Sequence, residues 1–163
     1  MKALLFVALS AVLLSTVGCK KSSDEPSANA NSWKVGNTSY TTMYAFRVTP
    51  SNGDPALTGW DRTPSPSMDY TKLNSWAVSF KTMPTTSGTY KIVGYPSSGF
   101  LANADEVYIT AFTAGTTYVS TGAGNLMATV TVTGNKIAVT VPQIPTMTTS
   151  GTASTFDGDL REM

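Results

Sequence analysis

Apolar and polar residues alternate most clearly between residues 126 and 141, where the chain reads LMATVTVTGNKIAVTV. A two-residue turn at 134–135 would pair Val132 with Ile137 and Val130 with Val139. That register places these apolar side chains on one face and the threonines on the other, and a slip of one residue would reverse the arrangement. The pattern therefore predicts a β-hairpin that is buried on one face.

Similar alternation recurs along the rest of the chain. Trp76, Val78 and Phe80 share one face of a short segment, and we expect this face in the core together with Trp33. The strands that such patterns predict cover residues 33–36, 40–48, 75–81, 88–95, 106–112, 117–121, 126–133, 136–141 and 155–162.

Two of these segments carry distinct stripes. In residues 155–162, Phe156 and Leu160 point one way, and the acidic residues between them point to solvent. The stripe of residues 40–48 consists of Tyr40, Tyr44, Phe46 and Val48. Its even spacing predicts a single strand with the aromatic side chains on the buried face.

Gly, Pro, Ser, Thr and Asn turns separate the strands, and long helical patterns are absent from the sequence. This organisation is typical of an all-β protein. We expect residues 32–163 to form a single domain, an antiparallel β-sandwich or flattened barrel of about eight or nine strands.

Residues 50–71 interrupt the strand pattern. Their four prolines cannot donate hydrogen bonds to a sheet; these are Pro50, Pro55, Pro64 and Pro66. A connection of this length is uncommon in a compact domain and is often functional. We therefore expect this connection to be the best location for a ligand site.

Trp60 and Tyr70 lie in this connection rather than on a periodic face. One interpretation is that Trp60 packs the connection onto the sheets. The other is that the two rings form a stacking platform for a sugar, with Asp54, Asp61 and Arg62 as hydrogen-bonding partners. Such a platform would suit a neutral polysaccharide.

The N-terminal residues show a different pattern. Lys2 precedes an apolar run over residues 3–14, which is shorter than the roughly 20 residues of a transmembrane helix and matches the core of a signal peptide. Small residues follow, up to the only cysteine of the chain, Cys19. The sequence TVGC at 16–19 resembles the lipobox of bacterial lipoproteins, with threonine where leucine is usual. The alternative is an ordinary secretory signal in which Cys19 has no role.

The lipobox resemblance implies cleavage before Cys19 and attachment of lipid to its sulfur. We therefore expect a lipoprotein signal peptide over residues 1–18 and a lipidated, flexible stalk over residues 19–31, whose composition is too polar to bury a core. The lipid would be the only covalent group and the contact with the membrane. The expected location is the outer membrane, on its periplasmic or its cell-surface side.

Four further segments resemble small uncharacterised β-sandwich lipoproteins of Bacteroidota type. They read NSWKVGNTSYT at 31–41, PTTSGTYKIV at 84–93, TTYVSTGAGNLMATVTVTGNKIAVTVP at 116–142 and STFDGDL at 154–160. The resemblance implies a β fold and an envelope location. It implies no activity and no catalytic residues.

The composition of the chain limits the catalytic and binding functions that it could have. The chain contains no histidine, and only 13% of its residues are charged, 11 of them basic and 10 acidic. It therefore lacks the commonest general base and zinc ligand, and it offers little attraction to a nucleic acid. No G-x-S-x-G or S-x-x-K sequence indicates a nucleophile. Asn52, Asp54 and Asp61 supply oxygen ligands of the kind that Ca²⁺ prefers, but their spacing matches no EF-hand, and we predict no metal.

Carboxylate pairs give little support to an enzyme. Asp105 and Glu106 are neighbours on a predicted strand and should point to opposite faces, while Asp157 and Asp159 fit a solvated outer face. We therefore predict a non-enzymatic binding or assembly domain of the cell envelope, with a glycan or an envelope protein as partner. The alternatives are a glycan-binding accessory lipoprotein and, less favoured, a hydrolase that uses carboxylates alone.

Overall fold

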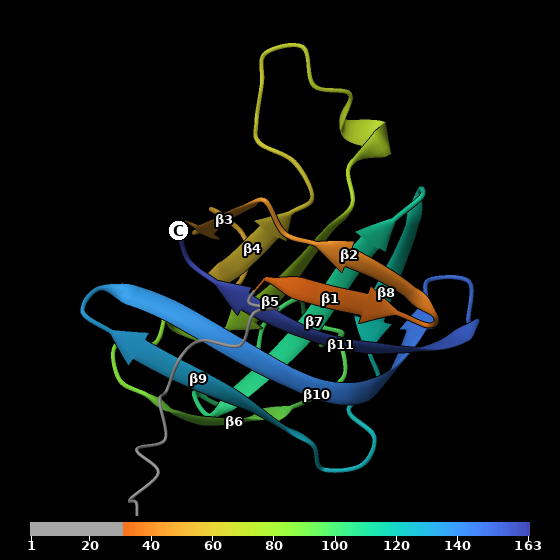
Figure 1. Cartoon of the computed structure of the whole chain (residues 1–163). Coiled ribbons are helices and arrows are strands. Elements are labelled where there is room, and N and C mark those ends of the chain that lie inside the picture. The colour runs from red at the N-terminus through yellow and green to blue at the C-terminus, as the bar shows by residue number, and fades with distance from the viewer. Residues whose placement is uncertain (1–30) are drawn as a thin grey trace, which may run out of the picture.

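The computed structural model describes residues 31–163 (Figure 1). The predicted signal peptide, Cys19 and the stalk up to residue 30 lie outside the described residues. The described part is all-β, as predicted, with one short 3₁₀-helix, η1 (Tyr70–Lys72). Its strands are β1 (Ser32–Val35), β2 (Thr38–Thr41), β3 (Tyr44–Val48), β4 (Ala56–Trp60), β5 (Ser75–Phe80), β6 (Gly88–Ile92), β7 (Glu106–Thr113), β8 (Thr116–Ser120), β9 (Met127–Thr133), β10 (Lys136–Thr148) and β11 (Ala153–Arg161).

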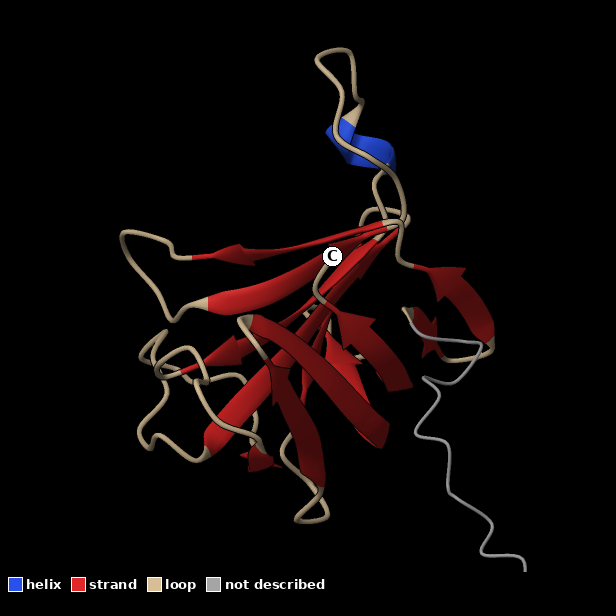
Figure 2. Ribbon diagram, turned by 60° about the vertical axis from the view of Figure 1, so that its left-hand side comes forward, coloured by secondary structure: helices blue, strands red, loops and turns tan. Residues whose placement is uncertain are grey.

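The strands form one continuous sheet in the order β2-β1-β11-β10-β9-β6-β7-β5-β4-β3. In addition, β8 pairs with both β7 and β10. Strands β7, β8, β10, β9 and β6 therefore close into a ring, and the remaining strands extend its two walls (Figures 1 and 2). A flattened barrel fits this arrangement, in agreement with the sequence. The described residues form 11 strands rather than the expected eight or nine, and β6 and β7 pair in parallel whereas the sequence predicted only antiparallel pairs.

The predicted hairpin is confirmed. β9 and β10 pair Thr133 with Lys136 and Val132 with Ile137, in the expected register. Val130, Ile137 and Val139 are buried, and the threonines of β9 are exposed. The turn at 134–135 and the alternation of side chains together specify this register.

The core contains the side chains that the sequence placed there. Trp33, Trp76, Val78, Phe80, Phe156 and Leu160 are each at most 2% exposed. The Phe156 ring lies 4.9 Å from the Trp76 ring and 6.2 Å from the Trp33 ring, measured between centroids. These three rings connect β1 and β11 in one wall with β5 in the other.

The predicted strand 40–48 is two strands, and its aromatic stripe is not one buried face. β2 and β3 lie at opposite ends of the strand order although only Thr42 and Met43 separate them. Thr42 donates its N–H to Asn31 O at 2.6 Å, and Met43 donates to Trp60 O at 2.7 Å. The chain thus crosses from one wall to the other between consecutive residues, and the crossing breaks the alternation on which the prediction depended.

A side-chain bond also joins the walls. Arg47 of β3 donates to Glu162 Oε2 at 2.8 Å and to the backbone oxygen of Asn135. Glu162 Oε2 also accepts the N–H of Ile137 at 3.0 Å. Arg47 therefore ties the last strand of one wall to the β9–β10 hairpin of the other.

Candidate functional site

Trp60 is the last residue of β4, not part of an irregular connection. Its neighbours in the sheet are Tyr44 on β3 and Ser75 on β5. The interpretation of residues 50–71 as one connection is therefore wrong. All four prolines of this stretch lie outside residues 56–60, so the backbone of this segment keeps every N–H that a strand with two neighbours needs.

Four aromatic rings gather on the outer face of β3 and β4, and we call them the aromatic patch: Tyr44, Phe46, Trp60 and Tyr70. Centroid separations are 4.9 Å for Phe46 and Trp60, 5.1 Å for Tyr44 and Phe46, and 6.1 Å for Trp60 and Tyr70. Tyr44 and Tyr70 are 36% and 59% exposed, whereas Ala45 on the opposite face of β3 is buried. The four rings thus lie on the solvent side of the sheet, where Phe46 and Trp60 are half-buried, in contrast to the buried stripe that the sequence predicted for Tyr44 and Phe46.

Asp61 and Arg62 close the base of the loop that carries Tyr70. Asp61 Oδ1 accepts from Arg62 Nε at 2.9 Å, and Asp61 Oδ2 accepts from Asn74 Nδ2 at 2.7 Å. Arg62 also donates to Lys72 O at 2.8 Å. The loop and η1 project from one end of the barrel (Figure 2). These bonds position the loop, so that Tyr70 lies against Trp60, and they occupy the two charged groups that the sequence assigned to a ligand.

The hydrogen bonds of Asp61 also set its ionisation. Partial burial opposes the charged form, but the bonds from Arg62 and Asn74 outweigh it, and the pKa of Asp61 lies below its ordinary value. A carboxyl group whose pKa is lower in the folded chain stabilises the fold above its unfolded pKa, and this contribution is lost as the pH falls through the folded pKa.

We expect Asp61→Asn to loosen this loop at neutral pH. Because the variant loses two charge-assisted bonds from Arg62, trypsin should cleave after Arg62 about tenfold faster than in the wild type. The difference in free energy of unfolding between the two proteins should shrink as the pH falls from about 4, where the carboxyl group of the unfolded chain becomes protonated, through the lower pKa of the folded chain. Asp159→Asn, on β11 and away from the loop, is the matched control. Equal cleavage of all three proteins would contradict the role of Asp61.

Asp54 lies at the other end of β4 from Asp61. Six residues separate them, most of them in an extended strand, which corresponds to about 20 Å, so the structure brings Trp60, Tyr70, Asp61 and Arg62 together and leaves Asp54 apart. At this separation Asp54 and Asp61 cannot share one ion, so the oxygen atoms of Asn52, Asp54 and Asp61 do not form one calcium site. Within residues 31–163, no three His, Cys, Asp or Glu side chains are grouped as metal ligands would be.

Asp54 instead belongs to a cavity of about 430 Å³. Its floor is the outer face of the sheet at Val48, Ala56, Thr58, Ser79 and Tyr108, and its walls are residues 50–54 and 95–100. Asp54 is 7% exposed, and its Oδ2 accepts the N–H of Leu101 at 2.6 Å. This bond fixes one wall to the other.

The aromatic residues of this cavity were not predicted as site residues. Tyr95 and Phe100 are 52% and 51% exposed, and the Tyr95 ring lies 5.2 Å from that of Tyr108. The segment YPSSGF at 95–100 places two large rings among turn residues, which is the only signal that the sequence offers. Burial raises the pKa of Tyr108 more than its hydrogen bond with Ser79 lowers it, so its hydroxyl group stays protonated at neutral pH.

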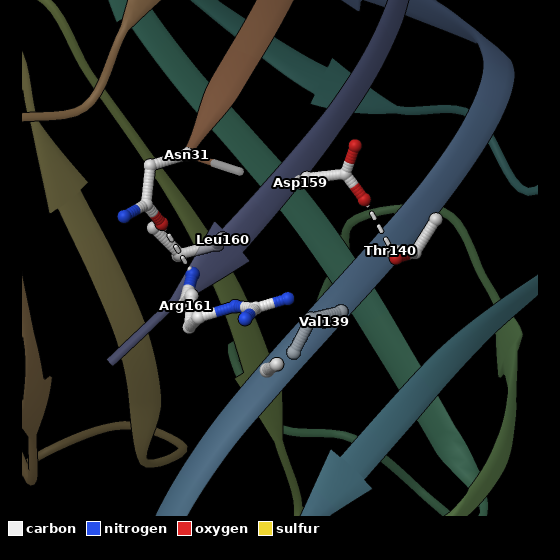
Figure 3. Close-up of a pocket in the computed structure, with 7 residues that line it drawn as sticks. Asn31, Val139, Thr140, Asp159, Leu160 and Arg161 are labelled. Atoms are coloured by element: carbon white, nitrogen blue, oxygen red, sulfur yellow. Dashed lines mark hydrogen bonds between the residues drawn. The ribbon is translucent and has the colours of Figure 1, made fainter. Parts of the chain in front are cut away.

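A second, smaller cavity of about 190 Å³ lies at β10 and β11 (Figure 3). Thr140 donates its hydroxyl hydrogen to Asp159 Oδ1 at 2.6 Å, and Arg161 donates its N–H to Asn31 Oδ1 at 2.6 Å. The one carboxylate group of this cavity therefore already has a partner. The arrangement fits a solvated strand face, as the sequence predicted for Asp159.

The comparisons with known proteins give no relative. The chain matches no protein-family model, no curated protein sequence and no solved structure. The resemblance to Bacteroidota lipoproteins therefore remains a prediction.

Among residues 31–163, no helix has the length and apolar composition that crossing a bilayer requires.

Proposed function

We propose that this protein is a lipid-anchored, non-enzymatic binding domain of the cell envelope that contacts its ligand through the aromatic patch. The observation that carries the proposal is the outward orientation of Trp60 and the three rings around it. Rings on a barrel face have no role in the core, and clustered exposed aromatic side chains mark interaction sites. The lipid on Cys19 would hold the domain at the outer membrane, on its periplasmic or its cell-surface side.

The carboxylate groups support a binding role over hydrolysis. Among residues 31–163, each of the cavities described above is lined by one carboxylate, Asp54 in the larger and Asp159 in the smaller. Both carboxylates accept hydrogen bonds within the fold. Glycoside hydrolysis normally uses two carboxyl groups that flank one bond, and neither cavity presents such a pair.

A neutral glycan is the narrower candidate for the ligand. Aromatic rings offer flat apolar surfaces on which sugar rings stack, and the patch itself carries no charged side chain. The charged residues next to it are paired with each other, Arg62 with Asp61 and Lys72 with Asp69. An uncharged surface of this kind favours an uncharged ligand.

The anchor is tested by Cys19→Ser. We expect the variant to lose lipid labelling and to remain unprocessed, because the sulfur that accepts the lipid is absent. Metabolic labelling with a fatty-acid analogue, followed by membrane fractionation, measures both effects. Unchanged processing and membrane retention would contradict the lipoprotein assignment.

The binding role is tested by Trp60→Ala on an array of neutral and anionic glycans. We expect binding to neutral glycans to fall by at least about tenfold, because a central aromatic contact is lost. Met127→Ala on β9, which removes another exposed large side chain, is the matched control and should bind as the wild type does. Mass spectrometry should recover the glycans unchanged. Equal binding by Trp60→Ala, or cleaved glycans, would contradict the proposal.

A further inference from the structure

The aromatic patch and the larger cavity lie on the same face of the sheet. On β3, Phe46 belongs to the patch, and Val48, two residues later, lines the cavity. On β4, Trp60 belongs to the patch, and Thr58 and Ala56 line the cavity. Residues two apart on a strand face the same way, so the two surfaces are continuous over about 13 Å.

The cavity walls are held in place before any ligand arrives. Asp54 binds the N–H of Leu101, and Lys81 Nζ donates to Leu101 O at 2.7 Å. The Leu101 side chain is 1% exposed and anchors the end of the wall that carries Phe100. A wall fixed in this way loses little conformational entropy on binding.

The groups in the cavity are those that recognise a sugar ring. Tyr95 and Phe100 present apolar ring surfaces, and the hydroxyl groups of Ser79 and Tyr108, which bond each other, keep lone pairs that can accept a further hydrogen bond. Lysine and arginine are absent from the lining, which disfavours an anion. The cavity volume lies in the range of small-molecule sites.

We propose that the cavity and the aromatic patch form one groove for an uncharged oligosaccharide. The cavity takes a terminal sugar ring, and Trp60 stacks on a ring further along the chain. This inference rests on the proposed function, to which it adds a second contact site and a direction for the ligand. It assigns ligand contacts to Phe100 and Tyr108.

The test uses the dependence of affinity on ligand length. The probes are unbranched gluco-oligosaccharides, α-1,4- and β-1,4-linked, from the monosaccharide to the hexasaccharide, titrated by calorimetry. We expect Phe100→Ala and Tyr108→Phe to weaken binding of every length by at least about tenfold. Trp60→Ala should weaken only the longer ligands, which reach the patch. Met127→Ala should leave all affinities unchanged.

Tryptophan fluorescence gives a second readout. Trp33 and Trp76 are buried, so a ligand that reaches the patch should change the emission of Trp60. We expect this change with the longer oligosaccharides, at concentrations that match the calorimetric Kd, and we expect Trp60→Phe to abolish it. Thermal melts of each variant verify that the fold is intact.

The remaining outcomes separate this proposal from the proposed function. If Trp60→Ala weakens binding and both cavity variants bind normally, the groove is overturned and the patch remains the binding surface. If only the cavity variants weaken binding, the proposed role of the patch fails. Absence of binding to both series, together with Trp60-dependent binding to phosphatidylethanolamine vesicles, would assign the face to lipid and overturn the glycan groove.

Discussion

Phe156→Ala is expected to lower the free energy of unfolding by about 3–5 kcal/mol. The Phe156 ring is fully buried between Trp33 and Trp76, and its removal leaves a cavity that two rigid indole rings cannot fill. Domains of this size have about 5–15 kcal/mol of stability, so the variant should be close to unfolding at ambient temperature. Urea denaturation followed by tryptophan fluorescence measures the loss.

Two variants bracket this prediction. Phe156→Leu keeps most of the apolar volume and should lose clearly less stability than Phe156→Ala. Phe100→Ala removes the same side chain from a position that is 51% exposed and should leave the unfolding midpoint nearly unchanged. If Phe156→Ala and Phe100→Ala lower the free energy of unfolding equally, Phe156 does not join the two walls.

Gly59→Ala is expected to destabilise the domain by about 1–3 kcal/mol, although it adds one methyl group. Gly59 lies on β4, and a side chain at this position would point into the core, toward Thr42, where the chain crosses between the walls. An added Cβ would lie 2.6 Å from Leu160 Cδ1 and 2.9 Å from Thr42 Oγ1. Both neighbours are buried in a packed interior, so their side chains or the backbone of β4 must shift to accept the methyl group. Thermal melts by circular dichroism measure the effect.

Gly88→Ala is the matched control for Gly59→Ala. Gly88 is also a strand glycine, but its added Cβ would have its nearest neighbour at 3.9 Å, at the edge of the Tyr90 ring. The control should be neutral or slightly stabilising, because alanine restricts the unfolded chain more than glycine does. A Gly59→Ala protein as stable as Gly88→Ala would show that the walls are not in close contact at Thr42.

Local periodicity explains what the sequence could predict about the fold. The register of the β9–β10 hairpin follows from alternation and a two-residue turn, both of which lie within one short segment. The crossing at Thr42 and Met43 and the parallel pairing of β6 with β7 depend on residues far apart in the chain. Neither feature changes the local pattern of apolar and polar residues, so the sequence did not predict them. β4 was not predicted because prolines lie on both sides of it, although residues 56–60 themselves contain no proline.

The candidate site was predicted in part. Trp60 and Tyr70 do lie together, with Asp61 and Arg62 beside them, but on a strand end and the loop that follows it rather than in one irregular connection. Asp54 was grouped with them by its sequence position, and β4 separates it from the others. The rings of Tyr95 and Phe100 were missed because they reach the outer face from a turn that shows no alternation.

The position of β11 between β1 and β10 affects how the chain can acquire its structure. β1 contains Trp33, near the start of the described chain, and its partner in the register is Gly158, near the end. A nascent chain that lacks β11 exposes two unpaired strand edges and the space that Phe156 fills. We therefore expect the sheet to be completed only when β11 is available, and such long-range pairing is slow. If the chain is exported as proposed above, this delay would keep it unfolded, and therefore competent for translocation, until β11 emerges.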